Sequence, residues 1–346
     1  MHCAPITDMA PSNFDSDQYG RLTRRAFLGG VSLTLAAAAC RRPPYDRRRF
    51  PVPSSSNVAL FAAADYRVDF EELIGRGLRE LGVDVRGRRV LLKPNMVEYE
   101  SGSVINTNPL VVVGAALAFR AAGAASVVIG EGPGHRRDME YLVTGTGLFD
   151  HLRENRISFV DLNHDDVAVV ELGSHFTGMQ QLALPVTLLQ SDFIVSVPKL
   201  KTHHWAVMTA SMKNFFGALP GAVYGWPKNI LHVHGITQSI LDLNATIRPH
   251  LSIVDGVVAM EGDGPIMGRA RSLGCVAMGT DLVAVDTTCA RMIGLDPHKI
   301  SYVKEAGQFL GQGDQRLIVQ RGEPLSRFAT RFDVVDHFKD LRLGAE

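Results

Sequence analysis

Short apolar runs alternate with helical segments along most of the 346-residue sequence, and this alternation constrains the fold more than any other feature. The apolar runs, which are typical of buried strands, cover residues 58–63, 89–92, 126–129, 157–160, 193–197, 251–254 and 273–278. Helical spacing and capping residues predict helices over 69–81, 108–122, 147–155, 236–247, 281–293 and 300–310. Strands that alternate with helices are typical of a parallel sheet covered by helices. We therefore predict an α/β fold with a largely parallel sheet flanked by helices.

The stretch 195–217 carries the densest group of polar side chains in the sequence. Pro198 ends the apolar run before it, because proline cannot donate a hydrogen bond to a sheet ladder. Thr202 is then a candidate N-cap for a helix over 205–216. Such a helix would direct its free N–H groups and its partial positive charge at a loop with two lysines, so the stretch predicts an anion site.

Polar side chains also follow other predicted strands at the point where each strand ends. In open α/β sheets, ligands bind beyond the carboxyl ends of the strands, so one parallel sheet would bring these groups to a single edge. Lysine side chains at such an edge suit a carboxylate or phosphate. The residues predicted to hold a small anionic molecule are Lys93, Asn95, Lys199, Lys201, Thr202 and Asn214.

The same edge would carry groups for acid–base chemistry or for a divalent metal ion, because carboxylates beside a histidine suit either role. The predicted catalytic residues are His203 as the acid–base group, Lys213 as an electrostatic stabiliser and Asp255 as a proton carrier or metal ligand. The predicted metal ligands are Glu131, Glu261 and Asp263.

Each of these predictions has a structural alternative. Residues 93–95 can equally form a turn, and the glycine-rich loop 130–134 lacks the spacing of a dinucleotide site. His203 and His204 are adjacent, so at most one of them faces a given ligand. Residues 219–233 are rich in glycine, proline, tryptophan and histidine, and predict a long functional loop or lid.

The four cysteines, Cys3, Cys40, Cys275 and Cys289, form no Cys-x-x-Cys pair. An iron–sulfur cluster or thiolate zinc site held by this chain alone is therefore not expected. Cys275 and Cys289 fall on a predicted strand and a predicted helix, and the sequence leaves open whether they form a disulfide or remain packed thiols. Asp286 lies inside an apolar helix, where a carboxylate is more often a buried hydrogen-bond acceptor or the partner of an inward lysine.

The N-terminal segment resembles a twin-arginine export signal. Arg24 and Arg25 precede a short apolar run that ends at Ala39 and is too short to span a bilayer comfortably. We interpret residues 1–40 as a signal read by the twin-arginine translocation machinery, and we expect the protein in the periplasm. Cys40 also fits a lipoprotein cleavage site, so a membrane-anchored lipoprotein and a free protein both remain open.

Composition sets the remaining boundaries. Residues 41–57 are rich in arginine, proline and serine, which predicts a linker to a domain over 58–346. We further expect that this domain has two lobes, 58–190 and 191–346, with a cleft between them. Lysine plus arginine equals aspartate plus glutamate, at 36 each, so the charge gives no reason to expect a nucleic-acid partner.

Seven short motifs follow one another in the sequence. They are Lys93-Pro94-Asn95, Glu131–Gly134, Pro198–His203, Met212–Gly217, Val254–Gly256, Met260–Pro265 and Ala284–Asp286. Together they resemble the bacterial and archaeal family of domain of unknown function 362, over roughly residues 89–297. Some members of that family carry an added cysteine-rich, ferredoxin-like segment that this sequence does not contain, so the resemblance implies no iron–sulfur role here. The resemblance supports these seven motifs as features of that family, and it implies no particular reaction.

These observations favour an exported enzyme that acts on a small anionic metabolite, with or without the assistance of a divalent metal ion. One alternative is a non-catalytic protein that binds a solute or a metal. Another is an accessory or maturation factor for an iron–sulfur or redox partner. The expected contact with a membrane is through the signal or a lipid anchor at Cys40.

Overall fold

The computed structural model describes residues 43–134 and 138–344. The predicted export signal and Cys40 lie outside the described residues. Residues Pro44–Glu346 form a compact unit, and one sheet contains strands from both of the lobes considered above. A search of the described helices finds none whose length and hydropathy would let it cross a bilayer.

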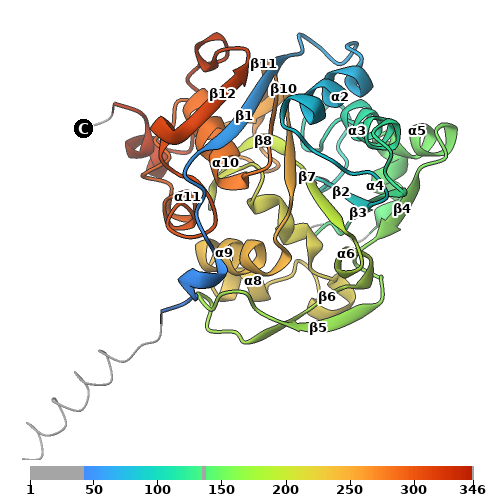
Figure 1. The fold of residues 1–346 in the computed structure, drawn as a ribbon, viewed down its shortest axis with the longest axis horizontal. Coiled ribbons are helices and arrows are strands. Elements are labelled where there is room, and N and C mark those ends of the chain that lie inside the picture. Colours follow the sequence, from blue (N-terminus) through green and yellow to red (C-terminus); the bar gives the residue numbers. More distant parts are fainter. Residues whose placement is uncertain (1–42, 135–137, 345–346) are drawn as a thin grey trace, which may run out of the picture. The chain divides into compact units, whose positions relative to one another are not determined.

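A ten-stranded sheet forms the centre of this unit (Figure 1). Its strands are β1 (Ser56–Ala62), β2 (Arg89–Pro94), β3 (Ser126–Glu131), β4 (Ser158–Asp161), β7 (Phe193–Val197), β8 (Lys199–His203), β9 (Val207–Thr209), β10 (Leu251–Glu261), β11 (Arg269–Gly279) and β12 (Ile318–Gly322). The main path runs β12-β1-β11-β10-β7-β2-β3-β4, and β8 and β9 branch from β10. The neighbours from β10 to β4 are all parallel, whereas β11 is antiparallel to β1 and β10. The predicted α/β fold with a largely parallel sheet is confirmed.

Helices flank this sheet. The α-helices are α2 (Phe70–Glu80), α3 (Pro109–Ala121), α4 (Met139–Gly145), α5 (Leu148–Glu154), α6 (Val186–Leu189), α7 (Gly221–Tyr224), α8 (Ile230–Val233), α9 (Ile236–Ile247), α10 (Leu282–Met292) and α11 (Ser301–Ala306). The 3-10 helices are η2 (Arg47–Arg49), η3 (Lys213–Ala218), η4 (Gln315–Leu317), η5 (Leu325–Arg327) and η6 (Asp336–Leu341). Side chains of Asn108 and Asp281 cap α3 and α10, as predicted from the sequence, and the side chain of Asp69 caps α2.

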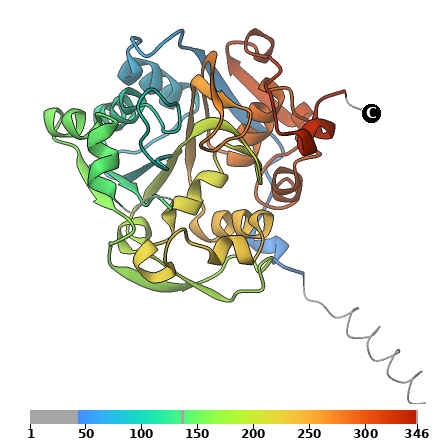
Figure 2. The same ribbon diagram turned by 180° about the vertical axis from the view of Figure 1, so that it is seen from behind.

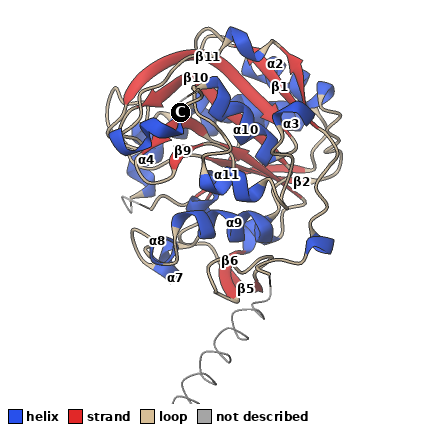
Figure 3. Cartoon of the chain, turned by 90° about the vertical axis from the view of Figure 1, so that its left-hand side faces the viewer, coloured by secondary structure: helices blue, strands red, loops and turns tan. Residues whose placement is uncertain are grey.

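Residues 161–190, which alternate only weakly in sequence, supply a separate pair of antiparallel strands, β5 (Val167–Glu171) and β6 (Gln181–Pro185). Figures 1 and 3 show this pair at one end of the unit, beyond α8 and α9.

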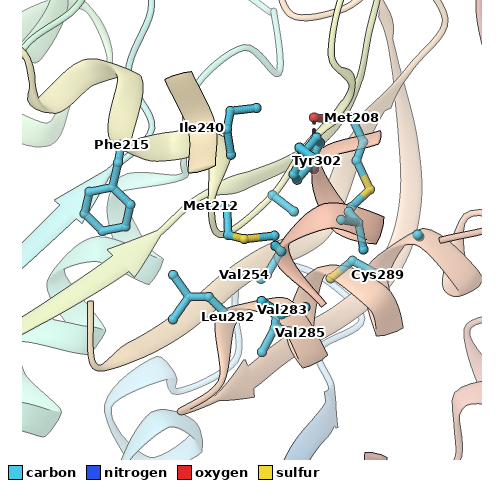
Figure 4. Packing of buried hydrophobic residues seen from close by; sticks show 14 of the residues in the cluster. Met208, Met212, Phe215, Ile240, Val254, Leu282, Val283, Val285, Cys289 and Tyr302 are labelled. Atoms are coloured by element: carbon cyan, nitrogen blue, oxygen red, sulfur yellow. Dashed lines mark hydrogen bonds between the residues drawn. The ribbon is translucent and has the colours of Figure 1, made fainter. Parts of the chain in front are cut away.

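Two hydrophobic cores lie on opposite faces of the sheet, because successive side chains of a strand point to opposite faces. In β2, Leu91 belongs to the core that contains α9 and α10, whereas Val90 and Leu92 belong to the core that contains α2 and α3. Figure 4 shows the first core, where Met212 and Phe215 pack near Ile240 of α9 and near α10. These apolar side chains stand on either side of Lys213 in the sequence and fix its backbone.

The helix predicted over 205–216 is wrong. The chain instead forms a hairpin of β8 and β9, in which Lys201 is paired with Thr209, followed by the short 3-10 helix η3. Thr202 is therefore no N-cap, and its hydroxyl donates to the carbonyl of Gly262. The predicted site at a helix N-terminus is not present in this stretch, and anion binding must rest on side chains.

The predicted linker also differs from the structure in part. Phe50 is buried, and the ring of Tyr45 stacks on Phe309 with centroids 4.0 Å apart. Residues 44–57 are thus held against the α11 region by aromatic packing rather than extending as a solvated tether. Among the described cysteines, Cys275 and Cys289 are both free and buried, which resolves the alternative in favour of packed thiols.

Candidate anion-binding site

A cavity of about 470 Å³ lies where β2 and β3 end, within the range typical of small-molecule sites. Its polar lining comes from β2, β3, β8 and η3, and the segment 227–232 completes it. Figure 2 shows the segment that contains η3, α7 and α8, in yellow, beside the orange helix α9. The cavity therefore occupies the edge that the strand-end pattern predicts.

A buried ion pair forms one wall of the cavity. Lys93 Nζ lies 2.7 Å from Glu131 Oε1, and both side chains are buried. The carboxylate also accepts hydrogen bonds from the backbone N–H groups of Met96 and Gly132. Burial lowers the pKa of Lys93, and the charge of Glu131 opposes this effect. Glu131 thus has its negative charge balanced by a lysine and is not poised to hold a metal ion.

Gly217 leaves the room that this pair needs. A Cβ atom at Gly217 would lie against Glu131 Oε1 and within 2.6 Å of Lys93 Nζ. Asn214, also in η3, supports the pair from the other side, because its amide donates to the backbone carbonyl of Lys93 and to Ser196 Oγ. The glycine and the amide of the Met212–Gly217 motif are thus explained by close packing on the Lys93–Glu131 pair.

Lys213 has no such partner. Its ammonium group lies 3.7 Å from the centroid of the Phe216 ring, and no described carboxylate pairs with it. Burial lowers its pKa to about 7, and the positive charge of Lys93 contributes to the shift. A lysine amine that lines a cavity with such a pKa can accept or release a proton near neutral pH.

Two further buried lysines line the cavity and bind only backbone oxygens. Lys201 Nζ donates to Ile105 O at 2.8 Å and Lys228 Nζ donates to Gly132 O at 2.5 Å. Burial lowers the pKa of Lys228 to about 7. Burial and the charges of neighbouring lysines lower the pKa of Lys201 well below its usual range.

The described lining therefore contains four lysines, Lys93, Lys201, Lys213 and Lys228, and one carboxylate, Glu131. Because Glu131 balances only one of the four, an anion that enters would meet uncompensated positive charge, or neutral amines that bind protons when it arrives. The side chain of Asn95 lies at the same wall, and its Oδ1 has no described hydrogen-bond partner. A ligand that combines an anionic group with a hydroxyl would match both features.

His203 lines the cavity but is partly committed to the local backbone. Its Nδ1 accepts hydrogen bonds from the N–H groups of Trp205 and Ala206. Burial and the charge of Lys213 hold its pKa well below the usual histidine range. The neutral imidazole with Nδ1 as acceptor therefore stabilises the turn after β8, and Lys213 is better placed than His203 for proton transfer.

A second buried lysine–carboxylate pair lies outside this cavity. Lys199 Nζ is 2.7 Å from Asp255 Oδ2 and 2.7 Å from the hydroxyl of Tyr66. Asp255 also accepts the backbone N–H of Asn108, which precedes α3. Burial raises the pKa of Tyr66. Neither Lys199 nor Asp255 lines this cavity, and their contacts join β8, β10 and the start of α3. Their roles in binding and catalysis stay predictions.

The predicted metal ligands are not brought together. Glu261 is paired with Arg269 at 3.0 Å, and Asp263 with His204 at 2.9 Å, whereas Glu131 pairs with Lys93. The described residues contain no group of three or more histidine, cysteine, aspartate or glutamate side chains that could hold a metal ion. The structure thus gives no support to the metal triad.

Asp286 stabilises the backbone that leads to Lys213. Its carboxyl oxygens accept the backbone N–H groups of Ser211 and Met212, at 2.7 and 3.2 Å, directly before Lys213. Burial raises its pKa to about 7. Of the two alternatives for Asp286, the hydrogen-bond acceptor is therefore the one observed.

Sequence reasoning missed Lys228 and the aromatic side chains at the mouth of the cavity. Trp205, Phe216 and His232 line it, with the rings of Trp205 and His232 5.5 Å apart. The available signal was the predicted functional loop 219–233, which contains Lys228 and His232. That segment is not irregular throughout, because it includes α7 and α8.

Fold and cavity together define an α/β protein with a lysine-lined pocket at the carboxyl edge of its sheet. The chain belongs to the family described as Domain of unknown function (DUF362), whose model matches residues 90–291. A curated relative, the thylakoid-associated protein sll1697 of Synechocystis sp., is 30% identical over 222 residues. That match covers 62% of this chain and 65% of the relative, so the chain spans just under two thirds of the relative's length.

Two solved structures match this chain at low identity and low TM-score. The lactate racemase apoprotein of Thermoanaerobacterium thermosaccharolyticum has a TM-score of 0.44 and 11% identity, over 72% of this chain and 58% of that chain. A Thermotoga maritima protein from a structural genomics programme has a TM-score of 0.35 and 15% identity, over 61% of this chain and 56% of that chain.

Proposed function

We propose that the protein is an enzyme that binds a small organic anion in the lysine-lined cavity and exchanges a proton with it through Lys213. The observation that carries this proposal is the imbalance of charge, with four lysines in the described lining and a single, already paired, carboxylate. An anion that binds there would give a counter-charge to Lys201, Lys213 and Lys228, for which the described residues supply no carboxylate partner.

The proton exchange rests on Lys213. Its amine has a pKa of about 7, so both protonation states are populated near neutral pH, as an acid–base catalyst requires. The remaining lysines would orient the anion and stabilise negative charge that develops during reaction. Because the predicted metal ligands lie apart, the proposal includes no divalent metal ion.

The experiment has two stages. Orthophosphate, oxalate, malonate and 2-hydroxy acids are first tested for thermal stabilisation at constant ionic strength, with wild-type protein, Lys213→Met and the exposed-site control Lys339→Met. Malonate and those 2-hydroxy acids that bind, which carry C–H hydrogens next to a carboxylate, are then incubated with the protein in D₂O, and deuterium incorporation or turnover is followed by NMR; phosphate and oxalate serve only to report binding.

We expect stabilisation of the wild type and of Lys339→Met, and exchange or turnover that Lys213→Met abolishes. If one or more of these anions bind but none of them shows exchange or turnover, the alternative of a non-catalytic solute-binding protein would be favoured. No stabilisation by any anion would overturn the proposal.

We further propose that the protein acts outside the cytoplasm, as the Arg24-Arg25 segment indicates. Cell fractionation of the wild type and of the double variant Arg24→Lys, Arg25→Lys tests this. Retention of the variant in the cytoplasm is expected, whereas equal export of both proteins would contradict the twin-arginine route.

A further inference from the structure

The cavity lining includes an exposed aromatic side chain that a purely ionic ligand does not need. Trp205 lines the cavity with 63% of its surface exposed. Its ring lies 5.5 Å from that of His232, which also lines the cavity. Trp205 therefore offers an apolar surface both to the cavity and to solvent.

The turn that presents Trp205 is held in a strained conformation. Val207 has a φ of 71°, which is rare for a β-branched residue. His203 stabilises the turn, because its Nδ1 accepts the N–H groups of Trp205 and Ala206. Backbone strain that the surrounding structure maintains is concentrated at functional sites. Trp205, two residues before Val207 in this turn, lies exposed beside the cavity.

The cavity lining combines cationic and apolar side chains. Beside the four lysines and Asn95, it contains Met96, Val97, Phe216, Leu231, Pro265 and Ile266. The ring of Phe216 lies 3.7 Å from the ammonium group of Lys213. A small inorganic anion bound by the lysines would leave much of this apolar lining without a ligand contact.

We propose that the ligand is an amphiphilic organic anion, with its charged group on the lysines and an aromatic or extended apolar body that passes Phe216 and leaves the cavity against Trp205. This inference rests on the proposed function, because it uses the same cavity, and it names the class of substrate. Aromatic bodies suit the site because stacked and edge-to-face ring contacts add to apolar burial.

The test compares two ligands with the same charged group, methyl phosphate and 2-naphthyl phosphate. Dissociation constants are measured by calorimetry, and the indole fluorescence of Trp205 is followed with Trp226→Phe as the background. We expect 2-naphthyl phosphate to bind at least tenfold more tightly to the wild type. Trp205→Ala should remove most of this gain and leave methyl phosphate unchanged, whereas Lys213→Met should weaken both ligands.

The control Val169→Ala removes an apolar side chain of β5 that is also exposed, at 66%, but does not line the cavity, and it should change neither constant. Equal affinities for the two phosphates would overturn this inference and leave the proposed function intact. Failure of both ligands to bind would count against both proposals. If Trp205→Ala abolished binding to phosphatidylglycerol vesicles but did not alter the affinity for 2-naphthyl phosphate, Trp205 would be a membrane contact and the inference would be wrong.

Discussion

Lys199 and Lys201 lie two residues apart on β8, yet they belong to different environments. Lys199 is paired with Asp255 and hydrogen-bonded to Tyr66, so its positive charge is neutralised inside the protein. Lys201 binds only backbone carbonyls and faces a cavity with two other lysines, Lys213 and Lys228, that lack a carboxylate partner. The charge of the first group is balanced inside the protein. Under the proposed function an anion would balance the second, and this difference would distinguish a structural lysine from a binding lysine.

The largest effect is expected at the complete group. Lys199→Met leaves Asp255 buried without a counter-charge, and removal of one partner of a buried pair costs about 3–5 kcal/mol. Urea denaturation measures the free energy of unfolding, with the exposed-site variant Lys339→Met as the control. A loss below about 1 kcal/mol, as is typical of an exposed pair, would contradict the structural role.

A smaller effect is expected where the cavity touches a buried pair. Gly217→Ala places a methyl group against Glu131 and Lys93, and overpacking of this kind costs about 1–3 kcal/mol. It should also weaken anion binding, because Lys93 must move. Gly75→Ala in α2 is a matched control, since the nearest atom to its Cβ is 3.5 Å away. That control should be neutral or stabilising, because alanine is favoured in helices.

Lys213→Met makes in the cavity the change that Lys199→Met makes at the buried pair. Unlike Lys199→Met, it should weaken anion binding without destabilising the fold. Lys213→Met removes an amine whose protonated form burial disfavours, so the free energy of unfolding at pH 7 should stay the same or rise. Anion affinity should fall about 10- to 100-fold, because a hydrogen bond to a charged group contributes about 1.5–3 kcal/mol. Calorimetric titration with oxalate checks the affinity. Strong destabilisation with unchanged affinity would remove the distinction between the two groups.

A further contrast concerns the pH dependence of stability. The pKa values of Lys213 and Lys228 are about 7 in the folded protein and close to 10.4 in an unfolded chain. Between these values the unfolded chain binds more protons, so the stability of the ligand-free protein should rise as the pH rises from about 7 towards 10. Stabilisation by an added anion should decline over the same interval. Urea titrations at several pH values, with and without oxalate, measure both slopes, and slopes of the same sign would contradict the assignment.

Local signals explain why much of the fold could be predicted. Asn108 before Pro109 and Asp281 before an apolar segment are capping signals contained within a few residues, and both helices begin there. The rule that strand ends share an edge brought Lys93 and Glu131 together correctly. These features depend on neighbours in the sequence or on the order of parallel strands.

The rest depended on contacts between distant segments. The helix expected over 205–216 is replaced by a hairpin and a 3-10 helix, because Asp286, far along the chain, binds the N–H groups of Ser211 and Met212. Glu261 faces Arg269 because of the pairing of β10 with β11. Which lysine acquires a carboxylate partner is likewise set by strand register. The path that brings Lys228 into the cavity has no local signature.

Proton uptake on anion binding tests the central claim most directly. At pH 8 the cavity amines of Lys213 and Lys228 are largely unprotonated, and an oxalate dianion should draw protons onto them as it binds. Calorimetric titrations in two buffers of different ionisation enthalpy measure this uptake. We predict net uptake of protons by the wild type and a smaller uptake by Lys213→Met, with Lys339→Met unchanged. Oxalate binding with no proton uptake, or no binding at all, would contradict the claim that the unpaired lysines form an anion site.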